Sequence, residues 1–257
     1  MTRLKNKSIL ITGGSSGLGA AAAILMAKDG AKIAIAARRR PESEEVVRKI
    51  EATGGEAMFI EADVTQRADV ERMVEEVVKR YGHLDCAVNN AGVNQTPFVA
   101  VADIEEEDWN TTIGVNLTGV WLCMKYEIRA MLKSGGGSIV NVSSIYGQKP
   151  SDIGHSAYSA SKHGVIGLSG SAAVDYAKDG IRVNSVCPGF CHSEMVDPEF
   201  EAQPELARSL LKRHSAAERL GTSDEAAEAM AWFCSDASSF VSGATLTVDG
   251  GATTRLY

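Results

Sequence analysis

The chain has 257 residues, of which 44% are hydrophobic, and a formal net charge of −7, so a single α/β domain with a sizeable core is within its reach. Its Lys and Arg residues are scattered rather than gathered into a basic stripe, which argues against nucleic acid as a partner. The sequence has no secretory leader pattern and no run of about 18 apolar residues, so we expect a soluble, cytoplasmic protein without a membrane partner.

Apolar runs alternate with helical periodicity along the chain. Strand patterns lie at residues 7–12, 32–37, 57–62, 84–89, 137–143, 181–187 and 244–248. Helical patterns lie at residues 20–30, 42–52, 67–81, 105–133, 158–178 and 223–234. This alternation predicts an α/β fold, a doubly wound Rossmann-type parallel sheet of about seven strands with helices on both faces. No linker or repeat divides the sequence, so one domain over residues 1–257 is predicted.

The first strand pattern is followed by a glycine-rich turn, Thr12-Gly-Gly-Ser-Ser-Gly-Leu-Gly19, which opens the first helical pattern. Glycines allow positive φ and close approach of a ligand, and the helix N-terminus attracts a pyrophosphate. The turn lacks the Lys-Ser/Thr ending of a nucleoside-triphosphatase loop. It therefore predicts a dinucleotide site, with a tight turn that binds nothing as the alternative.

The end of the second strand pattern bears on which dinucleotide binds. An acidic residue there would accept hydrogen bonds from the ribose hydroxyls and would repel a 2′-phosphate. This chain has Ala37, followed by Arg38 and Arg39, whose guanidinium groups offer donors suited to a phosphate. The sequence favours NADP(H) and leaves NAD(H) possible; the plain alternative is a pair of solvated charges at a strand end.

Three further side chains suggest acid/base chemistry. Ser144 follows the strand pattern at 137–143, at the strand end where ligands bind in open α/β sheets. Tyr158 and Lys162 lie four residues apart on one helix face. An ammonium beside a phenol lowers a pKa that starts near ~10, which would make Tyr158 an acid/base near neutral pH. Taken singly, the pair could be solvated and Ser144 could be a turn former.

Together with Asp63-Val64, Asn89-Asn90-Ala91-Gly92, Asn116 and Pro188-Gly189, these motifs resemble the short-chain dehydrogenase/reductase family over nearly the whole chain. The resemblance implies reversible hydride transfer between a nicotinamide cofactor and a carbonyl or secondary alcohol carbon. It implies that Tyr158 is the acid/base and that Ser144 binds the substrate oxygen. It also implies that Lys162 lowers the Tyr158 pKa and holds the nicotinamide ribose, and that Asn116 seats a water molecule.

The same resemblance implies a set of cofactor-binding residues. They are Gly13, Ser15, Ser16, Gly17, Leu18, Gly19, Arg38, Arg39, Asp63, Val64, Asn90, Ala91, Gly92, Tyr158, Lys162, Pro188, Gly189, Cys191 and Ser193. Two of them depart from the family's common pattern: Ser16 stands where many NADP(H)-preferring members carry a basic residue, and Ser193 stands where Thr is commoner. Arg38 is therefore expected to supply most of the discrimination between the two cofactors.

The segment at about 190–220 breaks the alternation and is expected to form a lid over the substrate side, with a static helical hairpin as the alternative. The predicted substrate pocket is mainly apolar, which suits a secondary alcohol or a ketone. A sugar or cyclic alcohol, a 3-oxoacyl thioester, and a non-enzymatic sensor or scaffold role remain open. His155 is expected to line this pocket, with an exposed histidine at the start of the helix as the alternative. The pocket residues are 93–98, Ile145, Tyr146, Gln148, Ile153, His155, Phe190, Met195, Val196 and Phe200.

Two expectations concern assembly and cysteine chemistry. Family members commonly form tetramers, and the helical patterns at 105–133 and 158–178 carry apolar residues beyond what one sheet face covers, so a homotetramer with D₂ symmetry is predicted. Five cysteines without C-x-x-C spacing predict reduced thiols and no metal site. The apolar helix residues are Trp121, Leu122, Met124, Leu168 and Val174.

Overall fold

The computed structural model describes residues 2–96, 98–151, 153–194 and 196–254. Its seven strands form one sheet in the order β3-β2-β1-β4-β5-β6-β7, and every neighbouring pair is parallel. The predicted fold class and strand number are confirmed. The strands are β1 Ser8–Thr12, β2 Lys32–Ala37, β3 Glu56–Glu61, β4 Cys86–Asn89, β5 Gly137–Val142, β6 Ile181–Pro188 and β7 Thr245–Val248.

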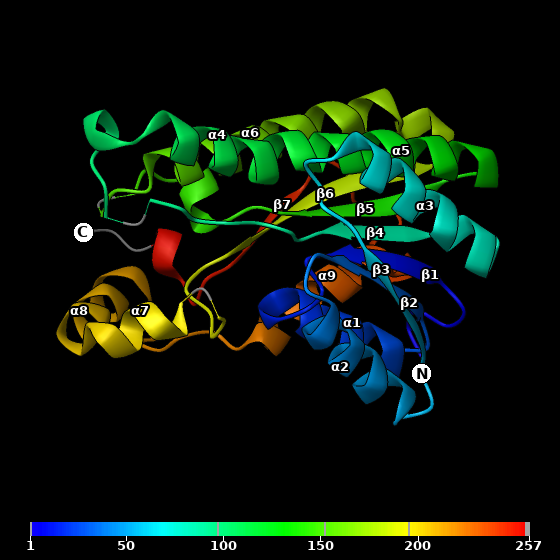
Figure 1. The fold of residues 1–257 in the computed structure, drawn as a ribbon, viewed down its shortest axis with the longest axis horizontal. Coiled ribbons are helices and arrows are strands. Elements are labelled where there is room, and N and C mark those ends of the chain that lie inside the picture. Colours follow the sequence, from blue (N-terminus) through cyan, green and yellow to red (C-terminus); the bar gives the residue numbers. More distant parts are fainter. Residues whose placement is uncertain (1, 97, 152, 195, 255–257) are drawn as a thin grey trace.

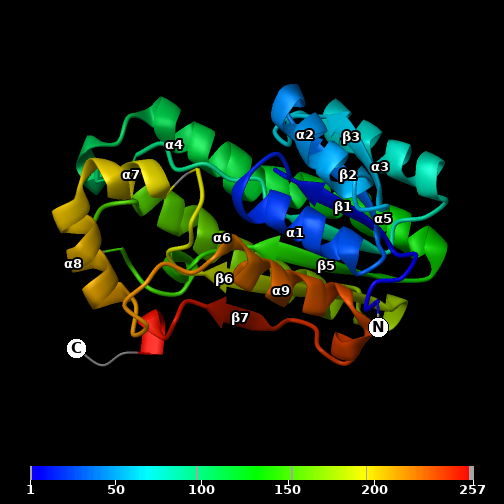
Figure 2. The ribbon, with the colours of Figure 1, turned by 90° about the horizontal axis from the view of Figure 1, so that it is seen from below.

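Helices cover both faces of the sheet (Figures 1 and 2). One core lies between the sheet and α3, α5 and α6, and the other lies between the sheet and α1, α2 and α9. The helices are α1 Gly17–Lys28, α2 Arg40–Glu51, α3 Arg67–Tyr81, α4 Glu106–Ile113, α5 Val120–Ser134, α6 Ser156–Asp175, α7 Asp197–Ala202, α8 Pro204–His214 and α9 Ser223–Cys234.

The central strands are apolar along their whole length because both of their faces are covered. Successive side chains of a strand point to opposite faces. In β1, Leu10 packs in the core beside α3 and α5, whereas Ile9 and Ile11 pack in the core beside α1 and α9. Because β1 lies between β2 and β4, the chain crosses the sheet after β3, which opens a crevice at the carboxyl ends of β1 and β4.

The helix predicted over residues 105–133 is interrupted, so that part of the prediction is wrong. A π-helical turn, Gly114–Gly119, separates α4 from α5. Within it, the Asn116 amide bonds the backbone of Val93 in both directions, each at 2.8 Å. Gly119 packs so closely on Val64 that a Cβ would lie 2.9 Å from its Cγ2. Single π-helical turns are frequent at functional sites, and this one places Asn116 beneath the crevice.

The segment between β6 and α9 forms two short helices, α7 and α8, beyond the carboxyl ends of the strands (Figure 1). Its two ends lie side by side, because Cys191 and Gly221 form a β-bridge and Gly221 N donates to the Phe190 carbonyl at 2.9 Å. Within the described residues, no helix combines the length and apolar character needed to cross a membrane.

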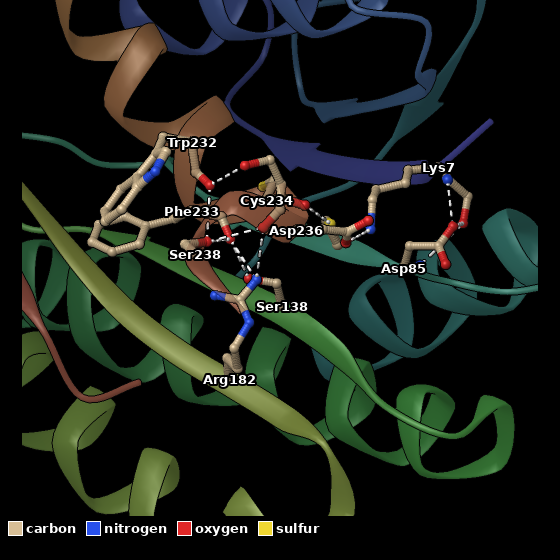
Figure 3. Close-up of polar contacts among 12 residues, drawn as sticks. Lys7, Asp85, Ser138, Arg182, Trp232, Phe233, Cys234, Asp236 and Ser238 are labelled. Carbon is tan, nitrogen blue, oxygen red and sulfur yellow. Dashed lines mark hydrogen bonds and ion pairs between the residues drawn. The ribbon is translucent and has the colours of Figure 1, made fainter. Parts of the chain in front are cut away.

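Arg182 of β6 anchors the C-terminal end of α9 at the opposite end of the molecule (Figure 3). Its guanidinium donates to the carbonyls of Phe233 at 2.8 Å and Val241 at 3.2 Å. The hydroxyl groups of Ser138 and Ser238 also donate to the Phe233 carbonyl, at 2.8 and 3.0 Å. Three side chains thus donate to the Phe233 carbonyl, one of the groups that a helix end leaves without an internal partner.

Replacement of this arginine is expected to destabilise the fold. Arg182→Met keeps most of the apolar stem but leaves buried carbonyls with fewer donors, which should lower the free energy of unfolding by roughly 2–3 kcal/mol. Urea unfolding at one fixed protein concentration measures the change. Arg208→Met, which removes an exposed arginine of α8, is the control and should change stability by less than about 0.5 kcal/mol. Equal stability of Arg182→Met and the parent would contradict this role.

Candidate active site

A cavity of about 590 Å³ lies along the carboxyl edge of the sheet. Much of its wall comes from segments that follow strands, with Gly13 after β1, Arg38 after β2, Asp63 after β3, Asn90 after β4 and Ser144 after β5. A second cavity of about 70 Å³ adjoins it. The two share five lining residues: Asn94, Ser144, Tyr158, Gly189 and Val196.

The glycine-rich turn brings backbone, rather than side chains, to the cavity wall. Gly13 has a φ of +65°, and a Cβ there would lie 2.8 Å from the Ala91 Cα. Gly17 has a φ of +51°, a backbone conformation that glycine adopts without strain. Gly19 packs its backbone against the Gly13 carbonyl, and a Cβ at residue 19 would collide with that oxygen. The turn therefore has the open backbone and helix N-terminus that suit a pyrophosphate.

The turn after β4 holds the glycine-rich turn in place. The Asn90 side chain donates to the carbonyls of Thr12 and Gly13 at 3.2 and 3.1 Å. In return, the Thr12 hydroxyl accepts from the backbone N–H groups of Asn90 and Ala91 at 3.1 and 3.2 Å. This reciprocal bonding gives Asn90 a structural role in addition to its place in the cavity wall.

The two arginines after β2 have different surroundings. Arg38 is 68% exposed and lies 3.9 Å from the Asp63 carboxylate. Arg39 donates to the Ser16 hydroxyl at 2.6 Å and pairs with Glu194 at 2.8 Å. A cation therefore lies beside Ser16 although that residue is neutral. Glu194, which follows β6 and lines the large cavity, is a site residue that sequence reasoning missed, because no local pattern links it to an arginine 155 positions earlier.

Ser144, Tyr158 and Lys162 come together where the two cavities meet. The Ser144 side chain hydrogen-bonds Tyr158. The Lys162 Nζ lies 5.5 Å from the Tyr158 ring centroid and donates to the Val142 carbonyl at 2.8 Å. Ser144 follows β5, while Tyr158 and Lys162 lie one helical turn apart on α6, so two neighbouring elements assemble the group.

Burial controls the charge state of this group. It raises the pKa of Tyr158 to about 12, against the Ser144 hydrogen bond, which lowers it. Burial also lowers the pKa of Lys162 to about 8. The expectation of a lowered Tyr158 pKa is therefore wrong for this structure, because desolvation of the phenolate outweighs a lysine whose own charge is disfavoured. Tyr158 is therefore protonated at neutral pH, which is the state that a proton donor needs.

Asn116 is fully buried below the site. Besides its two bonds to Val93, its Nδ2 donates to the Ser161 hydroxyl at 3.2 Å. A Cβ added at Gly92 would lie 3.4 Å from both the Asn116 Oδ1 and the Lys162 Nζ, so the two side chains face the same small space. Asn116 thus fastens the loop after β4 beside Lys162; its role in seating a water molecule stays a prediction.

Most of the predicted contact residues line one of the two cavities. Gly19 is the exception among the cofactor residues. In the substrate set, Gln148 instead accepts from the Thr247 hydroxyl at 3.0 Å, and Phe200 packs behind Phe190 with ring centroids 5.5 Å apart. Ile153 lines neither cavity, and Met195 and Pro97 lie outside the described residues. Of segment 93–98, Val93, Asn94 and Gln95 line the large cavity, whereas Thr96 and Phe98 line neither. Five further predicted residues line the small cavity: Ile145, Tyr146, His155, Phe190 and Val196.

A buried carboxyl group lies in the core beneath β4. Glu127 of α5 is fully buried, and its Oε2 accepts a hydrogen bond from the Asn89 side chain at 3.0 Å. Asn89 also donates to the Asn141 side chain at 2.9 Å, which links β4 to β5. Burial raises the pKa of Glu127 to about 8 and keeps the nearby Cys123 thiol protonated by raising its pKa. Glu127 is thus neutral at pH 7 in the folded protein.

This shift makes stability depend on pH. Between the ordinary carboxyl pKa of 4.5 and the folded value of about 8, the folded state binds one proton more than the unfolded state, so stability falls as pH rises, by at most about 1.4 kcal/mol per pH unit. Glu127→Gln should remove this fall and gain stability relative to the parent from pH 6 to pH 8. Urea unfolding across that range measures it, with the exposed Glu75→Gln as control. Parallel pH profiles for Glu127→Gln and the parent would contradict the buried neutral carboxyl.

All five cysteines are free and buried. Across the described residues, no three His, Cys, Asp or Glu side chains gather closely enough to hold a metal ion. His192 lies 2.9 Å from Asp197 rather than with the two cysteines near it in sequence.

The large cavity fits a nicotinamide dinucleotide. Open glycine backbone lies at one end, two arginines lie beyond β2, and the space above Gly92 leads to Lys162 and Tyr158. The crevice at the carboxyl ends of β1 and β4 is where parallel sheets of this kind bind a dinucleotide. A Ser, Tyr and Lys group at the same edge is typical of a nicotinamide-dependent oxidoreductase.

Comparison with known proteins agrees with this class. The family model described as Enoyl-(Acyl carrier protein) reductase matches residues 13–253. The chain is 43% identical to an A-factor type gamma-butyrolactone 1'-reductase (1S-forming) of Streptomyces virginiae, over 97% of this chain and 96% of the relative. It is 38% identical to a cyclohexanol dehydrogenase of Acinetobacter sp. (strain SE19), over 98% and 97% of the two chains.

Solved structures give the same answer. The crystal structure of levodione reductase superposes with a TM-score of 0.94 at 30% identity, covering 99% of this chain and 100% of that one. The chain belongs to the short-chain dehydrogenase/reductase family. The protein is an oxidoreductase that acts on CH–OH groups with an NAD(P) cofactor.

Proposed function

We propose that this protein is an NADP(H)-preferring oxidoreductase that interconverts a compact, cyclic secondary alcohol and the corresponding ketone, with Tyr158 as the acid/base. The observation that carries the proposal is the hydrogen-bonded pair of Ser144 and Tyr158, which lines both the large cavity and the small one. A substrate in the small cavity would thus present its oxygen to both hydroxyl groups while facing the cofactor cavity.

In this mechanism the cofactor, when bound, supplies or accepts the hydride. During reduction, Tyr158 donates its phenolic proton to the substrate oxygen, and Ser144 hydrogen-bonds the same oxygen and holds the carbonyl in place. During oxidation, Tyr158 accepts the proton from the alcohol. The Lys162 ammonium, buried beside the Tyr158 ring, stabilises the phenolate that proton donation leaves behind.

The cofactor preference rests on the end of β2. Ala37 is buried and brings no carboxylate to the ribose, while Arg38 and Arg39 line the same wall of the cavity. Two guanidinium groups favour a 2′-phosphate over a plain ribose. We assign the pyrophosphate to the backbone of the glycine-rich turn, the adenine to Asp63 and Val64, the nicotinamide ribose to Tyr158 and Lys162, and the carboxamide to Pro188, Gly189, Cys191 and Ser193.

The substrate class rests on the walls of the small cavity. They are mainly apolar and aromatic, with Ile145, Tyr146 and Phe190 among them, which suits a ring better than a long or charged chain. Relatives named as a cyclohexanol dehydrogenase and a levodione reductase support this choice. Among the alternatives, a sugar needs a more polar site and a 3-oxoacyl thioester needs a longer one.

The test is to measure binding of NADPH and NADH by fluorescence, and then to assay a panel of cyclic ketones and alcohols with the tighter cofactor. Tighter binding of NADPH together with turnover of at least one cyclic substrate is the expected result. Tighter binding of NADH would overturn the cofactor assignment alone. Binding of NADPH without turnover of any cyclic substrate would overturn the substrate assignment.

We also propose that residues 190–220 act as a lid. The segment reaches the cofactor side through Glu194, which pairs with Arg39 at 2.8 Å, and it reaches the substrate side through Phe190 and Val196. Binding of either ligand would therefore act on the same segment.

The location of the protein in the cytoplasm stays a prediction.

We further propose that the protein forms a homotetramer with D₂ symmetry. Trp121 of α5 and Val174 of α6 are 46% and 79% exposed, which leaves apolar surface for partner subunits on these helices. Leu122 and Met124 are buried within the single chain, so their predicted place on that surface is wrong. Light scattering is expected to give about four times the 27.2 kDa of one chain. A mass close to 27.2 kDa would contradict the assembly.

A further inference from the structure

His155 lies immediately before α6, three residues ahead of Tyr158, and lines the small cavity. Only 4% of it is exposed, so the alternative of an exposed histidine at the helix start is wrong. Its ring centroid lies 5.5 Å from that of Tyr146, 5.8 Å from that of Phe98 and 6.3 Å from that of Tyr158. The imidazole is thus one wall of an aromatic enclosure beside the reacting hydroxyl.

Three polar atoms of His155 and Asn94 beside this cavity are unpaired within the described part of the chain. Both ring nitrogens of His155 are buried without a hydrogen-bond partner among the described residues, and the same holds for the Asn94 Oδ1, which belongs to a residue lining the same cavity. Buried polar groups in folded proteins are normally paired, and an unpaired one is costly. A phenylalanine would fill an aromatic enclosure at no such cost, so packing alone does not account for a histidine here.

The backbone at this position is also constrained. His155 has a φ of +70°, in the left-handed region that a residue with a side chain rarely adopts. The preceding Gly154 has a φ of +90°, and a Cβ there would lie 2.9 Å from the backbone of Val99. Strained backbone of this kind persists where surrounding structure determines it, and it clusters at ligand sites. A left-handed backbone at the wall of the cavity therefore agrees with a ligand site.

We propose that His155, together with Asn94, binds a second oxygen of the substrate, so that the substrate is a compact ring carrying a hydroxyl or carbonyl group besides the one that reacts. The inference rests on the proposed function, since it assumes that Tyr158 and Ser144 bind the reacting oxygen. Ring centroids 6.3 Å apart place the second oxygen on the same ring as the reacting carbon rather than on a distant chain.

The hydrogen-bonding groups of His155 and Asn94 indicate which kind of substrate oxygen they would bind. Burial lowers the pKa of His155, so the ring is neutral and offers one donor and one acceptor. The Asn94 Oδ1 is an acceptor only. A hydroxyl group, which both donates and accepts, matches both residues, and a carbonyl matches the histidine alone. A carboxylate has no proton for Asn94 and meets no cation, so we expect a diol or a hydroxyketone rather than a ring acid.

The experiment compares oxidation of cyclohexanol with that of the 1,2-, 1,3- and 1,4-cyclohexanediols by the full-length protein with NADP⁺. We expect kcat/KM for at least one diol to exceed that for cyclohexanol by about tenfold, the factor that one good hydrogen bond contributes. His155→Phe should reduce this ratio to near one, and His155→Gln, which keeps a donor and an acceptor, should retain part of it. His163→Phe is the matched control, because His163 is exposed on the outer side of α6.

The outcomes separate this inference from the function on which it rests. Turnover of cyclohexanol and all diols at similar kcat/KM, or an equal loss on all of them in His155→Phe, would overturn the subsite and leave the proposed function standing. Binding of NADPH with no turnover of any member would overturn the proposed function. Thermal unfolding of His155→Phe is a second measurement: a melting temperature equal to or above that of the parent supports a histidine kept for a ligand, and a large fall marks it as structural.

Discussion

Tyr158→Phe is expected to lower kcat by a factor of roughly 10² or more, the contribution of a positioned acid/base group. The substitution removes one hydroxyl group, which Ser144 hydrogen-bonds in the parent protein. Lys162, which shares the proposed contact with the nicotinamide ribose, stays in place, so dinucleotide binding should fall far less than kcat. Steady-state kinetics in both directions, with dinucleotide binding followed separately by fluorescence, measures the two effects.

Tyr176→Phe is the matched control for this prediction. Tyr176 directly follows α6 and packs against the core on the far side from the site, so loss of its hydroxyl should leave kcat unchanged. A Tyr158→Phe protein with near-normal turnover would refute the acid/base assignment. Loss of dinucleotide binding in the same variant would instead show that the phenol is needed to hold the cofactor.

Replacement of both arginines after β2 is expected to lower kcat/KM for NADPH by about 10- to 100-fold or more. Hydrogen bonds to charged groups contribute about 1.5–3 kcal/mol each, and 1.4 kcal/mol corresponds to a factor of about ten. NADH has no 2′-phosphate, so the Arg38→Ala/Arg39→Ala protein should lose little of its activity with NADH. The ratio of kcat/KM for the two cofactors is the quantity to measure.

The single variants divide the effect between the two side chains. Arg38 is the more exposed of the two and pairs only loosely, at 3.9 Å from Asp63, so it is free to turn toward a phosphate. Arg39 donates to Ser16 and pairs with Glu194. It would have to give up its ion pair with Glu194 to bind the 2′-phosphate. Arg48→Ala on the outer face of α2 is the control. Equal losses with NADPH and NADH would refute a role in cofactor choice.

Much of the fold could be read from the sequence because its signals are local. Apolar runs and helical periodicity placed the seven strands, and the glycine spacing after β1 predicted a turn of open backbone at a helix N-terminus, which the structure has at Gly13 and Gly17. The helix bearing Tyr158 was predicted at the right place, because an i, i+4 pair on one face needs only the helix itself. The doubly wound arrangement of the parallel strands followed from general rules on crossovers.

Features that depend on contacts between distant segments were missed or predicted wrongly. The break between α4 and α5 involves Asn116, which bonds the backbone of Val93. The helical pattern did not predict this break, because the contact joins two separate segments. The pairing of Arg39 with Glu194 joins two loops that meet only in the folded chain. Gln148 lies near Tyr158 in sequence, yet it faces Thr247 of β7.

The sequence by itself determined the family and the sheet, and it predicted the group of Ser144, Tyr158 and Lys162, since residue types at short, ordered spacings carry that information. Tertiary structure alone decided the charge states and the shape of the substrate site. Burial, which no local pattern reports, keeps Tyr158 protonated and Glu127 neutral. Among the described residues, it also left the ring nitrogens of His155 without a hydrogen-bond partner in the cavity that Tyr158 lines, because desolvation and unpaired polar atoms arise only when distant segments pack together.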